Sequence, residues 1–441
     1  MSTRPPPGNQ INTQDSADQE SFAGFVRRAS TRGELVVQPR MGFGDPAQMR
    51  RGLVATRQAQ ATTVGTITLD SYTRVGDYAA VDRALADNVA LNGYPIVNYG
   101  PAATQRMIDG VHNASFPVQV RHGSPDPERI FRTLMAAGLD ATEGGPVSYC
   151  LPYSRLPLRT SVNNWARSCD LWAGLRDTGM EPHLESFGGC MLGQLCPPSL
   201  LVAISVLEGL FFQQHGLRSV SLSYAQQTNN AQDAESIIAL RQLATEFLPE
   251  IDWHVVLYAY MGMYPRTREG ALLLLSEAAE LAVQTGAARL IVKTVAEAHQ
   301  IPTIDDNVEA LETAAGAAAA VSTEPCKTAP ESGMITETRT LIEAVLELHP
   351  SVGTALVRAF SRGYLDIPYC LHADNRGRSL SYVDARGRLA WSSVGSMPIR
   401  GIGEAHETRQ VTASDLLSSL SYVERKFDRL AISSFPAKSL P

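Results

Sequence analysis

Three arginines stand at the ends of three short β-rich runs in this sequence. Arg40 follows "ELVVQP", Arg74 stands four residues after "TVGTITLD", and Arg121 is next to last in "FPVQVRH". Guanidinium groups form forked, two-bond contacts with carboxylates and phosphates. A single arginine at such a place is readily explained as an exposed loop residue or a structural ion pair. Three at equivalent places predict a pocket for a small anion, because buried cations need a partner.

Four further side chains accompany the arginines. His122 follows Arg121, Glu143 precedes two glycines, and Tyr149 and Tyr153 fall in "GPVSYCLPY" with the spacing that puts them on one face of a strand. Glu143 beside arginines would bind a substrate ammonium or move a proton. The alternatives are a structural histidine, a solvated glutamate and core tyrosines. Because the sequence shows no nucleophile elbow, P-loop or HExxH motif, these residues by themselves leave the reaction open.

The elements that must position these residues alternate between strand and helix patterns. Nine β-rich runs occur, namely "ELVVQP", "TVGTITLD", "YPIVNYG", "FPVQVRH", "GPVSYCLPY", "PHLESFG", "SVSLSYA", "DWHVVLYAY" and "ARLIVKT". Amphipathic helical stretches separate them, and Gly138, Gly179, Gly216 and Gly286 are expected to end helices. Ser124 and Pro125 are expected to start the helix after Arg121.

Repeated strand–helix units predict a parallel sheet covered by helices, and eight of them would close a (β/α)8 TIM-type barrel. At least one of the nine runs must then lie outside the barrel. An open doubly wound sheet is the alternative, but the turn "RMGFGDP" lacks the third glycine of its usual fingerprint. In a barrel the active site lies at the carboxyl ends of the strands, where the three arginines would converge.

The sequence predicts three segments: a disordered tail over residues 1–24, the barrel over 25–322, and a smaller α+β lobe over 323–441. The expected elements near the end are a last barrel helix over 303–320, helical residues 335–363, a hairpin with its turn at Asp384–Gly387, and a helix near 412–428.

Composition limits the function class. The chain has 441 residues, with 38 basic and 45 acidic side chains and a net charge of −7, which argues against nucleic-acid or anionic-membrane binding. Its six cysteines form no CxxC pair and predict reduced thiols without a zinc site. The sequence shows no signal peptide, and its longest apolar stretches are too short to span a membrane, so a cytoplasmic location is expected.

Seven motifs in order carry a family resemblance: "QPRMG", "LDSYTR", "LNGYP", "QVRHGSPD", "EGGPVSYCLPY", "YMGMYP" and "IVKTVAEAHQIPT". From about Val36 to Thr303 the chain resembles the large (epsilon) subunit of glutamate mutase, also called methylaspartate mutase. The resemblance implies a TIM barrel that takes part in an adenosylcobalamin-dependent radical rearrangement between L-glutamate and threo-3-methyl-L-aspartate. It also implies a homodimer within an ε2σ2 heterotetramer.

The same resemblance assigns the cobalt ligand to a separate small (sigma) subunit with a DxHxxG histidine. Here "DGVHNAS" has the wrong spacing, so the chain is expected to need that subunit and to hold no metal itself. The alternatives are a related barrel mutase or lyase for another amino dicarboxylate, and a non-catalytic binding homologue.

The resemblance also implies roles for individual residues. Glu143 and Arg121 are the expected catalytic residues, and the substrate contacts are Arg40, Arg74, Arg121, His122, Glu143, Tyr149 and Tyr153. The expected contacts to the cofactor are Gly42, Asn92, Pro152, Tyr264, Lys293, Glu297 and Ile301. Tyr264 stands where the family often has phenylalanine.

Overall fold

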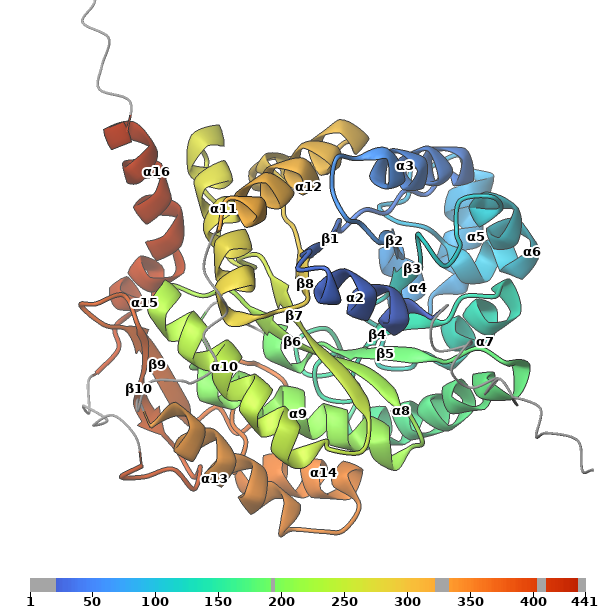
Figure 1. The fold of residues 1–441 in the computed structure, drawn as a ribbon. Coiled ribbons are helices and arrows are strands. Elements are labelled where there is room, and N and C mark those ends of the chain that lie inside the picture. The colour runs from blue at the N-terminus through green and yellow to red at the C-terminus, as the bar shows by residue number, and fades with distance from the viewer. Residues whose placement is uncertain (1–20, 192–194, 322–332, 403–409, 435–441) are drawn as a thin grey trace, which may run out of the picture.

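Eight parallel strands form one barrel in the computed structural model, which describes residues 21–191, 195–321, 333–402 and 410–434 (Figure 1). Their order is β1-β8-β7-β6-β5-β4-β3-β2, and a parallel bridge between Val37 and Thr63 joins the two ends. The strands are β1 (Val36–Gln38), β2 (Gly65–Thr68), β3 (Val118–Arg121), β4 (Ala141–Gly144), β5 (His183–Ser186), β6 (Ser219–Ala225), β7 (Asp252–Tyr258) and β8 (Arg289–Ile291). The predicted (β/α)8 barrel is confirmed.

Helices cover the barrel and follow its strands. They are α2 (Phe22–Thr31), α3 (Pro46–Gln58), α4 (Ser71–Val75), α5 (Tyr78–Ala86), α6 (Ile96–Ile108), α7 (Glu128–Ala137), α8 (Leu158–Ala173), α9 (Pro198–Gln214), α10 (Asn230–Phe247), α11 (Arg268–Thr285) and α12 (Ile304–Ala319). Three short 3-10 turns accompany them, η1 (Gly174–Thr178), η2 (Gly188–Cys190) and η3 (Val295–Ala298). Gly138, Gly179 and Gly286 end α7, η1 and α11 in the left-handed conformation, as predicted.

Two of the nine predicted strands are wrong, and one real strand was missed. In "YPIVNYG", Tyr94 makes a single bridge to Leu69, and helix α6 then begins at Ile96 because Pro95 has no amide to continue a ladder. In "GPVSYCLPY", Tyr149 N–H donates to the carbonyl of Gly145, so this stretch is a helical turn. The missed strand is β4, whose short sequence "ATEG" combines alanine, glutamate and glycine, three residue types that are depleted in strands.

The helix after Arg121 begins later than predicted. Helix α7 starts at Glu128, and Ser124 belongs to the preceding loop, where its hydroxyl accepts the amide of Asp126. Gly123 has a φ of 73°, a left-handed conformation that lets the chain leave β3 sharply. The abrupt exit is therefore real, but the loop rather than a helix cap produces it.

Polar side chains fill the middle of the barrel. Arg289 of β8 is completely buried and forms an ion pair with Glu185 of β5. It also bonds to Gln38 and lies 3.2 Å from Gln119 Oε1. His183 stacks on His254 with ring centroids 5.1 Å apart. TIM barrels more usually fill this space with branched apolar residues.

Helix α2 closes the amino-terminal end of the barrel. The Phe22 ring packs against His183 at the start of β5 and under the guanidinium of Arg289 at the start of β8. Arg27 forms an ion pair with Asp252 at the start of β7. The disordered tail was predicted for residues 1–24. Helix α2 begins at Phe22, so the last part of that segment is helical, and residues 1–20 lie outside the described residues.

The carboxyl-terminal segment lies against one side of the barrel (Figure 1, orange to red). It contains α13 (Met334–Leu346), α14 (Val352–Arg362), the antiparallel hairpin β9 (Ser379–Val383) and β10 (Leu389–Val394), α15 (Ala413–Leu420) and α16 (Tyr422–Ser434). Helix α13 packs on α9, α14 on α8, and α16 on α11. The hairpin turn at Asp384–Gly387 is confirmed by the bond from Asp384 N–H to the carbonyl of Arg388.

Candidate active site

A cavity of about 860 Å³ opens at the carboxyl ends of the strands. The structure brings all seven predicted substrate-binding residues to its wall, together with four of the predicted cofactor contacts. The lining set from these two groups is Arg40, Arg74, Arg121, His122, Glu143, Tyr149, Tyr153, Gly42, Asn92, Glu297 and Ile301. Segments that are far apart in the sequence therefore meet at one mouth, as barrel topology requires.

The three arginines reach the cavity from different kinds of element. Arg121 is the last residue of β3, and Arg40 lies in the loop after β1. Arg74 lies in the short helix α4 rather than at a strand end. Asp70 fixes that helix by accepting the amides of Tyr72 and Thr73 at 2.9 and 3.0 Å. An N-cap carboxylate is a strong helix start, and here it sets where Arg74 points.

Arg121 and Glu143 form the buried centre of the site. Arg121 Nε donates to Glu143 Oε2 at 2.7 Å, and the two side chains are 6% and 2% exposed. Tyr149 donates to the other carboxylate oxygen of Glu143. Burial opposes the charged form of Arg121, but the nearby Glu143 outweighs it and raises the pKa above the ordinary value. Chemically, Arg121 could bind a ligand carboxylate in place of Glu143, and Glu143 could bind a ligand ammonium in place of Arg121.

His122 is held in one neutral form. Its Nδ1 accepts the backbone amide of Ser124 at 3.0 Å, so the ring proton sits on Nε2. The ring stacks on Trp165, with centroids 5.9 Å apart, and Tyr149 packs edge-on against it. Burial, followed by the charges of Arg74 and Arg121, lowers the pKa of His122 to about 3. His122 is therefore a hydrogen-bond donor here and not a cation.

A buried glutamate supports the turn that carries Tyr149. Glu208 of α9 accepts the amides of Val147 and Ser148 at 3.1 and 2.9 Å, and the hydroxyls of Ser148 and Ser186 at 2.9 Å. A side chain at Gly145 would meet the Glu208 carboxylate at 2.1 Å. Burial raises the pKa of Glu208 to about 7. The segment forms a turn instead of the predicted strand because its amides donate hydrogen bonds to a carboxylate and not to a neighbouring strand.

A second set of charges lines the rim of the cavity. Glu297 Oε2 lies 3.1 Å from Arg40 Nη1 and 3.6 Å from Lys293 Nζ. Lys293 Nζ also lies 4.6 Å from the centre of the Tyr264 ring. Lys293, Tyr264 and Pro152 are not among the described residues that line the cavity, so they would act on a ligand there through their neighbours.

Sequence reasoning missed part of the wall and its support. Phe187, Met261 and Thr68 also line the cavity. Behind them, Tyr258 at the end of β7 hydrogen-bonds to Glu143 at 2.9 Å and also to Glu185. The signal that could have found Glu185 is a charge in the middle of the short strand "HLES", where a buried side chain needs a partner.

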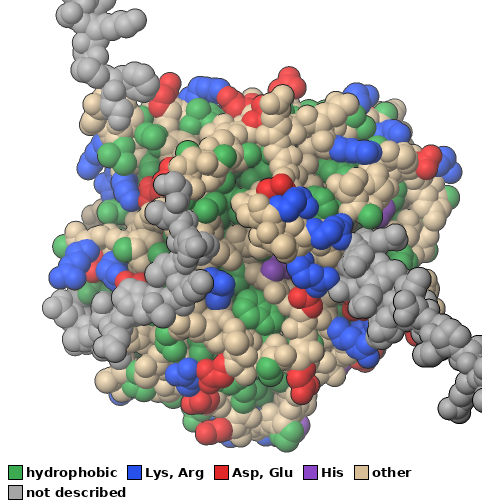
Figure 2. Space-filling model, in the orientation of Figure 1, with side chains coloured by type: hydrophobic (Ala, Val, Ile, Leu, Met, Phe, Trp, Pro, Cys, Tyr) green, Lys and Arg blue, Asp and Glu red, His purple; other side chains and the backbone are tan. Residues whose placement is uncertain are grey.

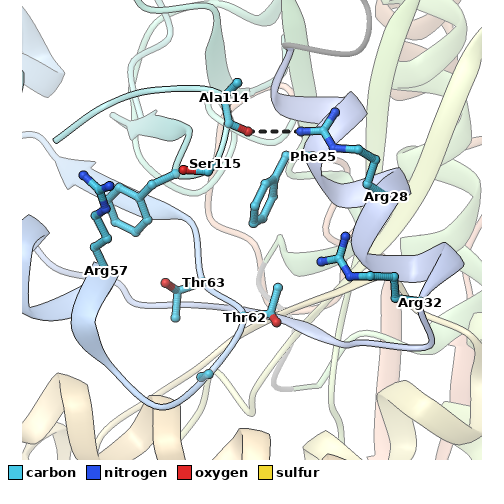
Figure 3. Close-up of a pocket in the computed structure, with 10 residues that line it drawn as sticks. Phe25, Arg28, Arg32, Arg57, Thr62, Thr63, Ala114 and Ser115 are labelled. Atoms are coloured by element: carbon cyan, nitrogen blue, oxygen red, sulfur yellow. Dashed lines mark hydrogen bonds between the residues drawn. The ribbon is translucent and has the colours of Figure 1, made fainter. Parts of the chain in front are cut away.

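A second cavity, of about 490 Å³, lies beside α2 at the opposite end of the barrel and is also lined by three arginines (Figure 3). Arg28 donates to the carbonyl of Ala114 at 3.0 Å, and Arg57 donates to the carbonyls of Gly110 and Val111. Arg32 pairs with Glu34 at 2.7 Å. Basic side chains gather right of the centre of Figure 2, over α2.

The described part of the chain contains neither a metal-ligating cluster nor a membrane-spanning helix. No group of three or more histidine, cysteine, aspartate or glutamate side chains there is placed to hold a metal ion. None of the described helices is both long and apolar enough to cross a membrane. The five described cysteines are free and buried.

Comparison with known proteins gives a consistent result. The family model described as methylaspartate mutase E chain (MutE) matches residues 17–415. A glutamate mutase epsilon subunit of Yersinia enterocolitica is 31% identical over 400 residues, covering 87% of this chain and 82% of that protein. Its counterparts from Desulfitobacterium hafniense and Halobacterium salinarum are 31% and 32% identical, covering 88% and 75% of this chain and 84% and 71% of theirs.

Proposed function

Because the chain belongs to the methylaspartate mutase E chain family, we propose that it is the substrate-binding catalytic subunit of an adenosylcobalamin-dependent mutase. The proposed reaction interconverts L-glutamate and threo-3-methyl-L-aspartate. The family membership makes the chain a glutamate mutase-type subunit, and the name "epsilon subunit" of its relatives implies further subunits.

The observation that carries the substrate proposal is the composition of the cavity wall. Three arginines face the cavity with two carboxylates, Glu143 and Glu297. An amino dicarboxylate offers two carboxylates and one ammonium, which suit separate guanidinium forks and one acidic side chain. Since Arg121 and Glu143 are already paired at 2.7 Å, the substrate would replace that contact with two of its own.

The protein's part in the proposed reaction is to hold both ends of the substrate still. Arg40, Arg74 and Arg121 would grip the two carboxylates while a carbon–carbon bond between them is broken and remade. Glu143 would receive the ammonium, and Tyr149 keeps its carboxylate oriented. The neutral His122 would add an N–H donor, because its Nδ1 is occupied by the amide of Ser124 and its ring lines the cavity. The closed barrel beneath the site keeps water away from the reacting carbons.

The rim of the cavity fits a large cofactor with polar and apolar faces. Ile301 and Val75 are each 67% exposed, and both line the cavity together with the carboxylate of Glu297. Asn92 Oδ1 accepts the amide of Ser71, which leaves the Asn92 amide group for a ligand. When bound, adenosylcobalamin supplies the carbon-centred radical that starts the rearrangement. Glu297 and Asn92 would bind its sugar hydroxyls, with Lys293 and Tyr264 supporting Glu297 from behind.

The Gly42 contact has a second explanation. A side chain at Gly42 would lie 2.3 Å from the carbonyl of Thr68, so glycine is required there by packing against β2. A contact between Gly42 and the cofactor therefore stays a proposal, like that of Pro152.

The partner proposal follows from the same face. The cobalamin-binding small subunit would dock over the mouth of the cavity, where Tyr72, Val75 and Ile301 expose apolar surface. The proposed assembly is an ε2σ2 heterotetramer, with the cobalt ligand on the small subunit.

The test is reconstitution of activity. The purified chain is mixed with a small subunit of proven competence, adenosylcobalamin and L-glutamate, and 3-methylaspartate is measured. We expect product that depends on all four components. L-aspartate and L-2-aminoadipate, one carbon shorter and one longer, serve as substrate controls, and turnover of either in preference to glutamate would contradict the substrate assignment.

A further inference from the structure

Tyr258 stands between two buried carboxylates. Glu143 and Glu185 occupy paired positions on the neighbouring strands β4 and β5, and both are buried. The Tyr258 hydroxyl lies 2.9 Å from Glu143 Oε2 and also within hydrogen-bond distance of Glu185 Oε1. Tyr258 itself is completely buried at the end of β7. One hydroxyl therefore connects the candidate active site to the polar centre of the barrel.

Each carboxylate has an arginine of its own. Arg121 pairs with Glu143 at 2.7 Å, and Arg289 pairs with Glu185. Gln119 Nε2 and the hydroxyl of Ser221 also donate to Glu185, at 3.2 and 3.0 Å. Two guanidinium groups therefore balance the two carboxylates in this interior.

The two acceptors have one proton to share. A tyrosine hydroxyl carries a single hydrogen, so it can donate to only one carboxylate at a time. Burial and the charges of both glutamates raise the pKa of Tyr258, so that hydrogen stays on the hydroxyl. Rotation about the C–O bond is all that separates a bond to Glu143 from a bond to Glu185.

We propose that Tyr258 is a positioning residue whose hydroxyl, within reach of both Glu143 and Glu185, turns to Glu185 when a substrate ammonium binds Glu143. This inference rests on the proposed function, because it needs a ligand with an ammonium. Three donors lie within hydrogen-bond distance of Glu143, namely Arg121, Tyr149 and Tyr258. An incoming zwitterion takes Arg121 with its carboxylate and gives Glu143 its ammonium. Glu185, fixed by Arg289, then accepts the released hydroxyl, so no polar group is left unpaired.

The charged groups around Glu143 and Tyr258 define what else could shape the pH profile of the enzyme. The charged and titratable side chains that face Glu143 or its hydroxyl partner are Arg121 from β3, Tyr149 and Tyr153 after β4, Glu185 from β5, Cys190 from η2, Tyr258 from β7 and, through Glu185, Arg289 from β8. Of these, only Tyr258 touches both carboxylates.

The experiment is the pH dependence of kcat/KM for the reconstituted enzyme with Tyr258→Phe. Losing a hydrogen bond to a charged group should lower kcat/KM by roughly 10- to 100-fold. The acid limb of the profile should move up by about half to one pH unit, because the Tyr258 hydroxyl is one of the donors that lower the pKa of the buried Glu185 carboxyl. Tyr258→3-fluorotyrosine, a stronger donor, should move the same limb to lower pH.

The matched control is Tyr224→Phe. Tyr224 is also a fully buried strand tyrosine, and its hydroxyl donates to the carboxylate of Asp233 at 2.8 Å, away from the cavity. We expect an unmoved pH profile for this variant. If the Tyr258→Phe profile, and that of the fluorotyrosine variant, also stay unmoved, the inference is wrong. If the wild-type enzyme forms no product, the proposed function fails instead, and circular dichroism separates either outcome from misfolding.

Discussion

The two arginine-lined cavities, at opposite ends of one barrel, treat the same residue type differently. At the carboxyl ends of the strands, Arg121 is 6% exposed and is held by a carboxylate at 2.7 Å. At the amino-terminal end, Arg32 is 53% exposed, and Arg28 and Arg57 donate to backbone carbonyls. Both cavities contain three guanidinium groups. Arg32 also pairs with a carboxylate at 2.7 Å, so burial of the ion pair, not the number of charges or the presence of a carboxylate, distinguishes the two cavities.

The largest expected effect comes from Arg121→Lys. A lysine keeps the charge but cannot reproduce the guanidinium fork, and it leaves Glu143 with a weakened buried partner. We expect kcat/KM for 3-methylaspartate formation to fall roughly 100-fold or more, because a broken buried pair costs about 3–5 kcal/mol. Arg57→Lys at the other cavity is the control and should keep wild-type kcat/KM. Equal activity of the two variants would contradict the difference drawn between the cavities.

The next effect is on stability and concerns Glu208→Gln. The variant replaces a carboxylate that accepts four hydrogen bonds, so buried donors around Tyr149 lose their partners. The free energy of unfolding should fall by about 1–3 kcal/mol. Denaturant unfolding measures this change. Glu34→Gln, beside the second cavity, is the matched variant. It should change the free energy of unfolding far less, since the Arg32–Glu34 pair is solvent-exposed.

A pH effect of intermediate size is expected from His122. Its pKa in the folded protein is about 3, below the unfolded value near 6.5, so the unfolded chain binds more protons between those values. His122 therefore makes stability fall as pH drops from about 6.5 toward 4, by up to about 1.4 kcal/mol per unit.

The measurement compares the wild type with His122→Gln, by denaturant unfolding at several pH values. The variant should lose less stability on acidification. Glu208 and Asp233, with pKa values raised to about 7 by burial, act in the opposite direction in both proteins, so only the difference is informative. Parallel pH curves for the two proteins would show that His122 already titrates normally.

The smallest effect is expected for Arg57→Gln in the second cavity, beside α2. Its side chain is exposed and, among the described residues, hydrogen-bonds to backbone carbonyls, so the free energy of unfolding should change by less than about 0.5 kcal/mol. Thermal unfolding and the mutase assay check this together. A large loss of stability or of activity would mean that Arg57 does more than join α3 to the loop before β3.

Much of the fold was predictable from the sequence because it depends on local pattern. Strand runs such as "SVSLSYA" and "DWHVVLY" have β-rich compositions, and glycines such as Gly138 and Gly286 end helices through a backbone conformation that favours glycine. The errors fall where a distant residue decides the local structure. The segment after Gly145 folds as a turn because Glu208 of α9 takes its amides.

The sequence by itself determined the residue types of the candidate site and their order along the barrel. Arg40, Arg121 and Glu143 each lie at or just after a strand, and closure of the barrel brings such positions together. Only the tertiary structure decided which charged and polar side chains pair with each other. Tyr258 shares its hydroxyl between Glu143 and Glu185, and Arg289 neutralises Glu185, through contacts that span β4 to β8. Electrostatic pairing depends on distance and burial in space, and neither quantity is encoded in the spacing of residues along the chain.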